Sequence, residues 1–161
     1  MTLGDTLKIL FVAALPIAEL RLAIPGAIEF LETPWYYAFL IAVIGNILPV
    51  PFILLFLEAA TRLMSKVAVF ERFLNWLFER TRRRSKIIQR YKRIGLVLFV
   101  AIPLPVTGAW TGSLAAVLFD IKFKQAFISI FIGVIIAGII VTSLWMLLGF
   151  AFGSLDFAGL W

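Results

Sequence analysis

Residues 16–25, PIAELRLAIP, place Glu19 and Arg21 between two prolines, with apolar sequence on both sides. Charged side chains are costly at membrane depth, so they usually face a partner or a water-filled cavity and indicate a functional site. A proline removes a backbone donor and disturbs the preceding helical turn, so a continuous helix through this stretch is not expected. Irregular backbone is tolerated inside a bilayer only where protein or water covers it. The stretch therefore predicts the tip of a broken, re-entrant helical hairpin that lines a polar cavity.

The composition indicates an all-α integral membrane protein with a single membrane domain over residues 1–161. The chain is 63% hydrophobic, with a mean hydropathy of +1.06, well above the apolar share of a soluble domain. Cysteine and histidine are both absent, which excludes disulfides, thiol nucleophiles, Cys/His metal sites and imidazole proton shuttles. Without a nucleophile–base arrangement either, we expect no enzyme, no cofactor and no metal site.

The apolar pattern divides the chain into five segments. Residues 7–31 and 94–119 are apolar blocks that prolines interrupt, and residues 35–60 and 123–150 are predicted transmembrane helices. Residues 61–93 lie between the two halves. Each arm of an interrupted block has about a dozen residues, or roughly 18 Å of helix, against a hydrocarbon core of about 30 Å. Neither arm spans a membrane alone, so both blocks are predicted to be re-entrant hairpins.

Residues 61–93 predict a basic amphipathic helix on the membrane surface. Apolar residues recur there at helical spacing, and basic residues occupy most of the other positions. We expect Arg82, Arg83, Arg84 and Lys86 to hold anionic lipid headgroups as a cytoplasmic anchor. The alternative is a vestibule that gathers a phosphate-bearing substrate.

The two halves of the chain align without a gap at an offset of 88 residues. The proline-broken tips coincide, Glu32 aligns with Asp120, and Gly45 aligns with Gly133. Interrupted apolar segments in corresponding positions are typical of inverted-repeat transporters, whose substrate site lies where the two breaks meet. The alignment predicts an inverted repeat of a re-entrant hairpin plus a transmembrane helix.

The distribution of charge favours this arrangement over four plain spans. If both interrupted blocks are hairpins, thirteen of the fifteen basic residues lie on one face, which would be cytoplasmic. With four spans, Lys122 and Lys124 would instead lie outside. We therefore expect a multi-pass protein of the cell (inner) membrane, with residues 61–93 cytoplasmic and both termini external. The concentration of basic residues in one segment fits membrane orientation rather than nucleic-acid binding.

Two stretches resemble the signatures of the small multidrug export protein family, which looks like a branch of the wider DedA (VTT-domain) superfamily. They are Glu19–Gly26 (ELRLAIPG) and Ile102–Leu114 (IPLPVTGAWTGSL). The resemblance implies two re-entrant hairpins that meet inside the membrane. It also implies proton-coupled movement of lipid-linked phosphates or phospholipids between leaflets, by an acidic residue of the first hairpin and an arginine of the second. Glu19 matches the acidic residue, whereas the second stretch has no arginine, so Arg21 would have to supply that charge.

Glu19 is the predicted proton-coupling residue. An apolar surround disfavours its charged form, whereas a nearby Arg21 favours it. The alternative is a purely structural ion pair. Residues two apart on a regular helix point away from each other, so a direct pair requires a non-helical tip. If the tip is helical, Arg21 needs another partner, such as a substrate phosphate.

The other predicted substrate-binding residues are polar or aromatic side chains near the breaks. The hydroxyl groups could bond to a substrate, to Glu19, or to carbonyls that the prolines leave unpaired. The asparagine could bind substrate or join two helices, and the tryptophan could stack on a substrate or fill the hairpin junction. These residues are Asn46, Thr107, Trp110, Thr111 and Ser113.

The charged, proline-broken segments predict a proton-coupled transporter or flippase for an amphipathic substrate, and the basic segment favours an anionic one. The resemblance implies a lipid-linked phosphate or a phospholipid. The alternative is a small multidrug efflux carrier for lipophilic cations, although Arg21 and the basic segment would repel cations. A non-transporting scaffold has no need for charge at membrane depth. The expected partners are membrane lipids, the substrate and protons, without nucleic acid; the sequence leaves a monomer and a homodimer both open.

Overall fold

The computed structural model describes residues 2–64, 85–104 and 107–153, and every regular element within these ranges is a helix. The predicted all-helical class is therefore confirmed for this part of the chain. Arg82, Arg83 and Arg84 lie outside the described residues, as does the side chain of Lys86. The helices are α1 (Leu3–Ala14), α2 (Glu19–Phe30), α3 (Trp35–Ile47), α4 (Val50–Met64), α6 (Ser85–Ala101), α7 (Ala109–Leu118) and α8 (Phe123–Gly153).

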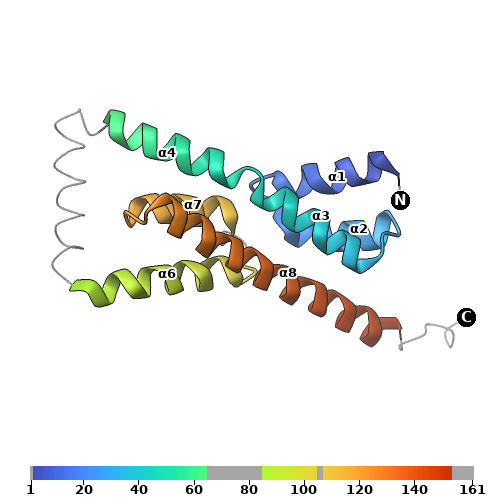
Figure 1. The fold of residues 1–161 in the computed structure, drawn as a ribbon. Coiled ribbons are helices and arrows are strands. Elements are labelled where there is room, and N and C mark those ends of the chain that lie inside the picture. The colour runs from blue at the N-terminus through green and yellow to red at the C-terminus, as the bar shows by residue number, and fades with distance from the viewer. Residues whose placement is uncertain (1, 65–84, 105–106, 154–161) are drawn as a thin grey trace, which may run out of the picture.

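Two helical hairpins approach each other from opposite ends of the molecule (Figure 1). Hairpin 1 consists of α1 and α2, and hairpin 2 consists of α6 and α7. Hairpin 1 extends inward from the end that carries the N-terminus, and hairpin 2 extends inward from the other end. Their tips meet near the middle, where Trp110 of α7 donates a hydrogen bond from its indole Nε1 to the carbonyl of Ala14, at 3.0 Å.

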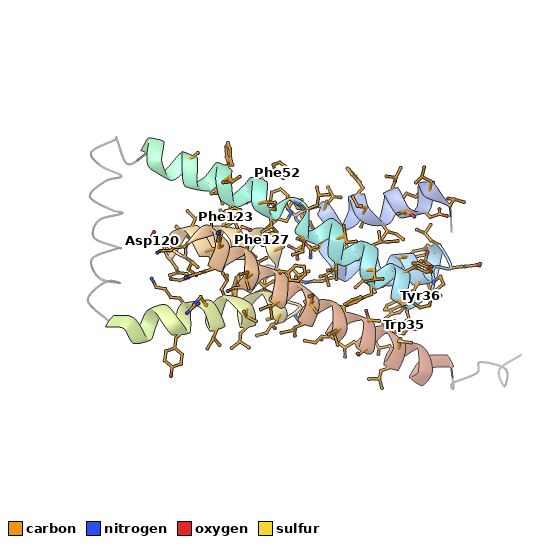
Figure 2. All side chains as sticks on the ribbon, in the orientation of Figure 1. Trp35, Tyr36, Phe52, Asp120, Phe123 and Phe127 are labelled. Carbon is orange, nitrogen blue, oxygen red and sulfur yellow. The ribbon has the colours of Figure 1, made fainter. Side chains whose placement is uncertain are left out.

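Two longer helical segments run beside the hairpins and are long and apolar enough to cross a membrane. They are Trp35–Leu57, with 23 residues, and Phe123–Gly149, with 27 residues. Trp35 and Phe123, the first residues of α3 and α8, lie towards opposite ends of the molecule, so the two segments run in opposite directions (Figure 2). Both agree with the transmembrane helices that the sequence predicts.

The prolines act differently at their different positions. The first block breaks at residues 15–18, around Pro16, whereas α2 continues through Pro25. The expectation of irregular backbone throughout residues 16–25 is therefore wrong for residues 19–25. Pro25 removes only one helical hydrogen bond, and neighbouring helices allow such a loss within a membrane. In the first long segment the helix is interrupted at residues 48–49, while Pro51 is tolerated in the first turn of α4.

One predicted boundary is displaced. The sequence places the end of the surface helix at residue 93 and the start of the second hairpin at residue 94, but α6 is a single helix from Ser85 to Ala101. The last basic residues of the predicted surface helix therefore belong to the first arm of hairpin 2. This arm has 17 residues, whereas α1 has 12.

Glycines allow each hairpin to pack closely against a long helix. A Cβ on Gly45 of α3 would lie 2.6 Å from the carbonyl oxygen of Leu10 in α1. A Cβ on Gly133 of α8 would lie 2.7 Å from the Cβ of Val100 in α6. Both distances are too short for real Cβ atoms, so both helix crossings require glycine.

Several structural boundaries recur at the 88-residue offset found in the sequence. Helices α2 and α7 end at Phe30 and Leu118, and helices α3 and α8 start at Trp35 and Phe123. In the turns between them, Glu32 and Asp120 both have positive φ, at 46° and 52°. The two close-packing glycines, at positions 45 and 133, obey the same offset. Corresponding parts of the two halves thus have corresponding local structure.

Candidate functional site

Glu19 occupies the point where hairpin 1 changes direction. It is the first residue of α2, it is 5% exposed, and its φ of 48° lies in the left-handed region. This backbone conformation removes its side chain from the regular helical register. As a result, Glu19 Oε2 lies 3.7 Å from Nη2 of Arg21, although residues two apart on a helix normally point apart. The structure thus shows the direct ion pair that the sequence allowed only for a non-helical tip.

Arg21 connects hairpin 1 to the tip of hairpin 2. Its Nη1 donates a hydrogen bond to the carbonyl of Leu104, and its Nη2 donates to Oγ1 of Thr107 at 3.3 Å. The Arg21 side chain is only 18% exposed. A guanidinium has five donor hydrogens, so it can bind the carboxylate and the second hairpin at the same time. Arg21 therefore holds a positive charge between the two tips.

The carboxylate of Glu19 lies against the start of α7. Its Oε1 accepts a hydrogen bond from the backbone N–H of Trp110 at 3.5 Å. The N-terminal end of a helix favours a negative charge, because its first N–H groups have no partner within the helix. A Cβ on Gly108 would overlap the carboxylate, so a side chain at this position would displace Glu19. The second hairpin thus accommodates the acidic residue of the first.

The hydroxyl groups of hairpin 2 bond to backbone carbonyls. The hydroxyl of Thr107 lies within hydrogen-bond distance of two carbonyl oxygens, Ile102 O at 2.6 Å and Leu104 O at 3.0 Å, and can donate its one proton to either. Thr111 donates to Gly108 O at 3.4 Å, and Ser113 donates to Ala109 O at 2.7 Å. These acceptors belong to hairpin 2 itself, and they differ from the carbonyls of Phe99 and Ala101, four residues before Pro103 and Pro105. The role of these residues towards a substrate stays a prediction.

Trp110 lies at the hairpin junction and also borders an apolar pocket. The bond from its indole to Ala14 O satisfies a carbonyl in the last turn of α1. On another side, a pocket of about 530 Å³ opens between α4 and α7. Its lining residues are Phe52, Ile53, Phe56, Leu57, Trp110 and Leu114. An apolar surface therefore begins at the same residue whose backbone binds Glu19.

Asn46 is buried near the end of α3, with 1% of its surface exposed. Its Oδ1 has no hydrogen-bond partner among the described residues. The predicted bond between helices is thus not made through this oxygen. An unpaired buried carbonyl is destabilising, so Asn46 stays a candidate for substrate binding on this observation.

Sequence reasoning missed two components of the tip junction. One is the Leu104 carbonyl that Arg21 binds, and the other is Gly108, which leaves space for Glu19. A glycine directly before a helix start was the available signal for the second. Among the described residues, no three acidic, cysteine or histidine side chains gather in a way that could hold a metal ion.

The fold and the two long apolar helices indicate a helical membrane protein. A family model described as "Putative small multi-drug export protein" matches residues 19–140, and the chain belongs to this family. The matched region contains Glu19, Arg21, α7 and most of α8. No curated protein and no solved structure matches the chain.

Proposed function

We propose that this chain is a proton-coupled membrane transporter or flippase for an amphipathic substrate with an anionic headgroup, such as a lipid-linked phosphate or a phospholipid. The observation that carries the proposal is the Glu19–Arg21 pair, which is buried between the tips of two hairpins. Burial of a charged pair costs desolvation energy. Charged residues within a membrane therefore usually mark a functional site. The export function named in the family description supports transport in general.

The proposed topology makes both hairpins re-entrant and the two halves an inverted repeat, as in the DedA superfamily. The 12 residues of α1 and of α2 give roughly 18 Å of helix each, too short for a bilayer of about 30 Å. The opposite approach of the hairpins and the recurring boundaries support the repeat (Figure 1). Lys92 donates to Phe119 O at 2.8 Å, so the part of α6 around Lys92 lies near the turn that carries Lys122 and Lys124. This end would be cytoplasmic.

In the proposed mechanism, a proton and an anion are coupled because Arg21 exchanges one partner for another. When Glu19 takes up a proton, its carboxyl group becomes neutral and its attraction to Arg21 is lost. Arg21 is then free to bind an anionic headgroup, which its planar group of donors fits well. When Glu19 releases the proton, its carboxylate competes with the headgroup for Arg21. The proton and the anion would therefore bind together and leave together.

The apolar pocket could bind the hydrocarbon part of an amphipathic substrate. It begins at Trp110, whose backbone N–H binds Glu19, and extends along α4 away from the charged pair. An acyl or prenyl chain in this pocket would place the attached headgroup near Arg21. A substrate with both a chain and an anionic group thus fits both parts of the site.

Efflux of lipophilic cations is the second candidate function. The family description favours it, and Glu19 next to an apolar pocket could attract such a cation. However, the guanidinium of Arg21 lies 3.7 Å from the carboxylate and would repel the substrate. We therefore rank this function below transport of an anionic amphiphile.

Transport by the purified protein in liposomes under an imposed pH gradient tests the proposal. The assay compares a labelled polyprenyl phosphate with a fluorescent lipophilic cation, for the wild type and for Glu19→Gln. Glu29→Gln, an exposed position on the same helix, is the matched control. We expect the lipid to move with the wild type and Glu29→Gln but not with Glu19→Gln. Normal lipid transport by Glu19→Gln would overturn the coupling, and movement of the cation alone would establish the second candidate.

A further inference from the structure

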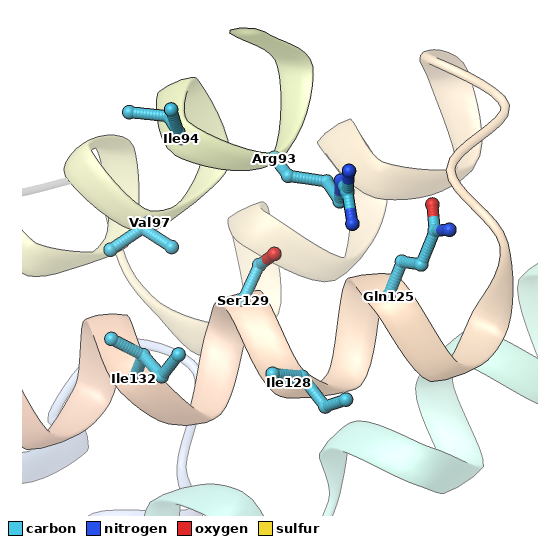
Figure 3. A pocket seen from close by; sticks show the side chains of 7 residues that line it. All are labelled: Arg93, Ile94, Val97, Gln125, Ile128, Ser129 and Ile132. Carbon is cyan, nitrogen blue, oxygen red and sulfur yellow. The ribbon is translucent and has the colours of Figure 1, made fainter. Parts of the chain in front are cut away.

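A second pocket lies between α6 and α8, on residues that take no part in the hairpin-tip site (Figure 3). Its volume is about 340 Å³. Three polar side chains and four apolar ones line it: Arg93, Gln125 and Ser129, with Ile94, Val97, Ile128 and Ile132. The guanidinium of Arg93 points into the space between the two helices, towards Gln125 and Ser129 (Figure 3). The polar groups thus converge from two helices on one place.

None of the three polar side chains has a partner within the part of the chain that the structure describes. No ion pair or hydrogen bond of the Arg93 guanidinium occurs there, and Gln125 and Ser129 make no side-chain hydrogen bond there. Ser129 is nevertheless only 4% exposed. Arg93 and Gln125 are exposed, so their donors are accessible beside Ser129 to a ligand that accepts several hydrogen bonds. A guanidinium beside an amide and a hydroxyl suits an oxyanion such as a phosphate.

The charge around the pocket also favours an anion. Among the residues whose side chains the structure describes, the basic ones at this end are Lys92, Arg93, Lys122 and Lys124. Of the acidic residues with described side chains, Asp120 lies at this end, in the turn between α7 and α8. The positive excess is local, since the opposite end carries Glu29 and Glu32. A basic pocket between helices at one membrane face is a recognised way to hold an anionic lipid headgroup.

The apolar residues of the pocket suit a ligand that carries a hydrocarbon chain. Ile94, Ile128 and Ile132 are 53%, 57% and 43% exposed, so this face of α6 and α8 is open to the surroundings. In a helical membrane protein such a face meets lipid. Along α8, Gln125 is nearest the basic end, and Ser129 and then Ile132 follow towards the middle. A headgroup at the polar side chains would therefore direct its chain along the isoleucines.

We propose that this pocket is a binding site for the phosphate headgroup of an anionic membrane lipid, with Arg93, Gln125 and Ser129 as donors. The inference goes beyond transport, because it concerns a bound lipid at the basic face and does not require Glu19. Arg93 supplies the charge, whereas Gln125 and Ser129 fix the orientation of the phosphate. The lipid chain covers Ile128 and Ile132.

Titration of the purified protein in an uncharged detergent, followed by native mass spectrometry, tests this site. The lipids are phosphatidylglycerol and, as a zwitterionic comparison, phosphatidylcholine. The variants are Arg93→Gln and Lys124→Gln, which remove the same charge from the same end; Lys124 is exposed and does not line the pocket. We expect Arg93→Gln to bind phosphatidylglycerol about 10-fold more weakly, since hydrogen bonds to a charged group contribute on that order. Lys124→Gln should bind within about 2-fold of the wild type.

Two further results decide between the sources of the binding. Equal losses in Arg93→Gln and Lys124→Gln would overturn the site and leave only a general attraction to the basic face. Unchanged binding by Arg93→Gln would overturn it as well. Soluble glycerol phosphate should compete only weakly because it lacks the chain, and competition as strong as that of the lipid would exclude the lipid as the specific ligand. Ser129→Ala should weaken binding about 3-fold, as expected for a single neutral hydrogen bond.

Discussion

The carboxylate of Glu19 lies directly against the backbone of Gly108, so closely that a side chain at position 108 would displace it. The two residues belong to different hairpins and lie in the two stretches that carry the family resemblance. Gly108 immediately precedes α7, and its missing side chain lets Glu19 reach the backbone N–H of Trp110. The position of Glu19, the proposed proton-coupling residue, therefore depends on Gly108, which has no side chain.

Gly108→Ala should impair transport by displacing Glu19. The new Cβ would overlap the carboxylate, so Glu19 would have to leave α7 or hairpin 2 would have to move. Because misplacement of a charged group by about 1 Å can cost on the order of 100-fold in rate, we expect at least a 10-fold loss of transport. Gly95→Ala is the matched control, since a Cβ there meets nothing within 4 Å. Transport by both variants in liposomes checks the prediction, and equal rates would contradict it.

The stability losses from removing the two members of the buried ion pair should not be additive. In Arg21→Gln, Glu19 stays buried without its counter-charge, and we expect a loss of about 3 kcal/mol in the free energy of unfolding. The double variant Glu19→Gln/Arg21→Gln should be less destabilised than the sum of the single ones, by about 1–2 kcal/mol. Chemical unfolding in detergent, followed by tryptophan fluorescence, gives the free energy of unfolding of the wild type, the two single variants and the double variant.

The exposed Asp5–Lys8 pair is the control for this double-mutant cycle. Its charged atoms are also 3.7 Å apart, but the Lys8 side chain is 68% exposed. Exposed pairs contribute little because water screens them. The corresponding cycle of Asp5→Asn and Lys8→Gln should therefore give a coupling energy close to zero. Similar coupling energies for the two pairs would mean that burial does not strengthen the Glu19–Arg21 interaction.

The sequence was sufficient to predict the helices and breaks that depend on local sequence features. Long apolar runs predicted the two spanning helices, and prolines predicted the breaks near residues 16, 49 and 103. These features depend on hydrophobicity and on the missing proline donor, which act within a few residues. Pro25 shows where the rule fails, because a membrane helix with packed neighbours can continue through a proline.

The candidate site could be predicted only in part. The two charges within an apolar block identified Glu19 and Arg21, but their direct contact depends on the positive φ of Glu19. This conformation is uncommon for a residue other than glycine, and the sequence does not specify it. The bonds from Arg21 to hairpin 2 join residues more than 80 positions apart, so they follow from tertiary packing alone.

Equivalent substitutions at the two helix crossings should have equivalent effects. Gly45→Ala would press a methyl group against α1, and Gly133→Ala would press one against α6. Overpacking of this kind costs about 1–3 kcal/mol, and we expect both variants to lose stability within that range. Gly149→Ala, on the open part of α8, should not be destabilised. Thermal unfolding of the three variants checks this, and a loss at only one crossing would argue against structural equivalence of the two halves.

Single cysteines should show the two ends of the molecule on opposite sides of the membrane. The chain has no native cysteine, so Leu3→Cys and Lys124→Cys each carry one thiol at an exposed position. With re-entrant hairpins, residue 3 lies outside and residue 124 lies in the cytoplasm. With four spans and a cytoplasmic basic segment, the sides of both residues are reversed. We expect an impermeant thiol reagent to label intact cells of Leu3→Cys and to label Lys124→Cys only after the membrane is opened. Labelling in the opposite order would replace the hairpins with spanning helices and would contradict the proposed inverted repeat.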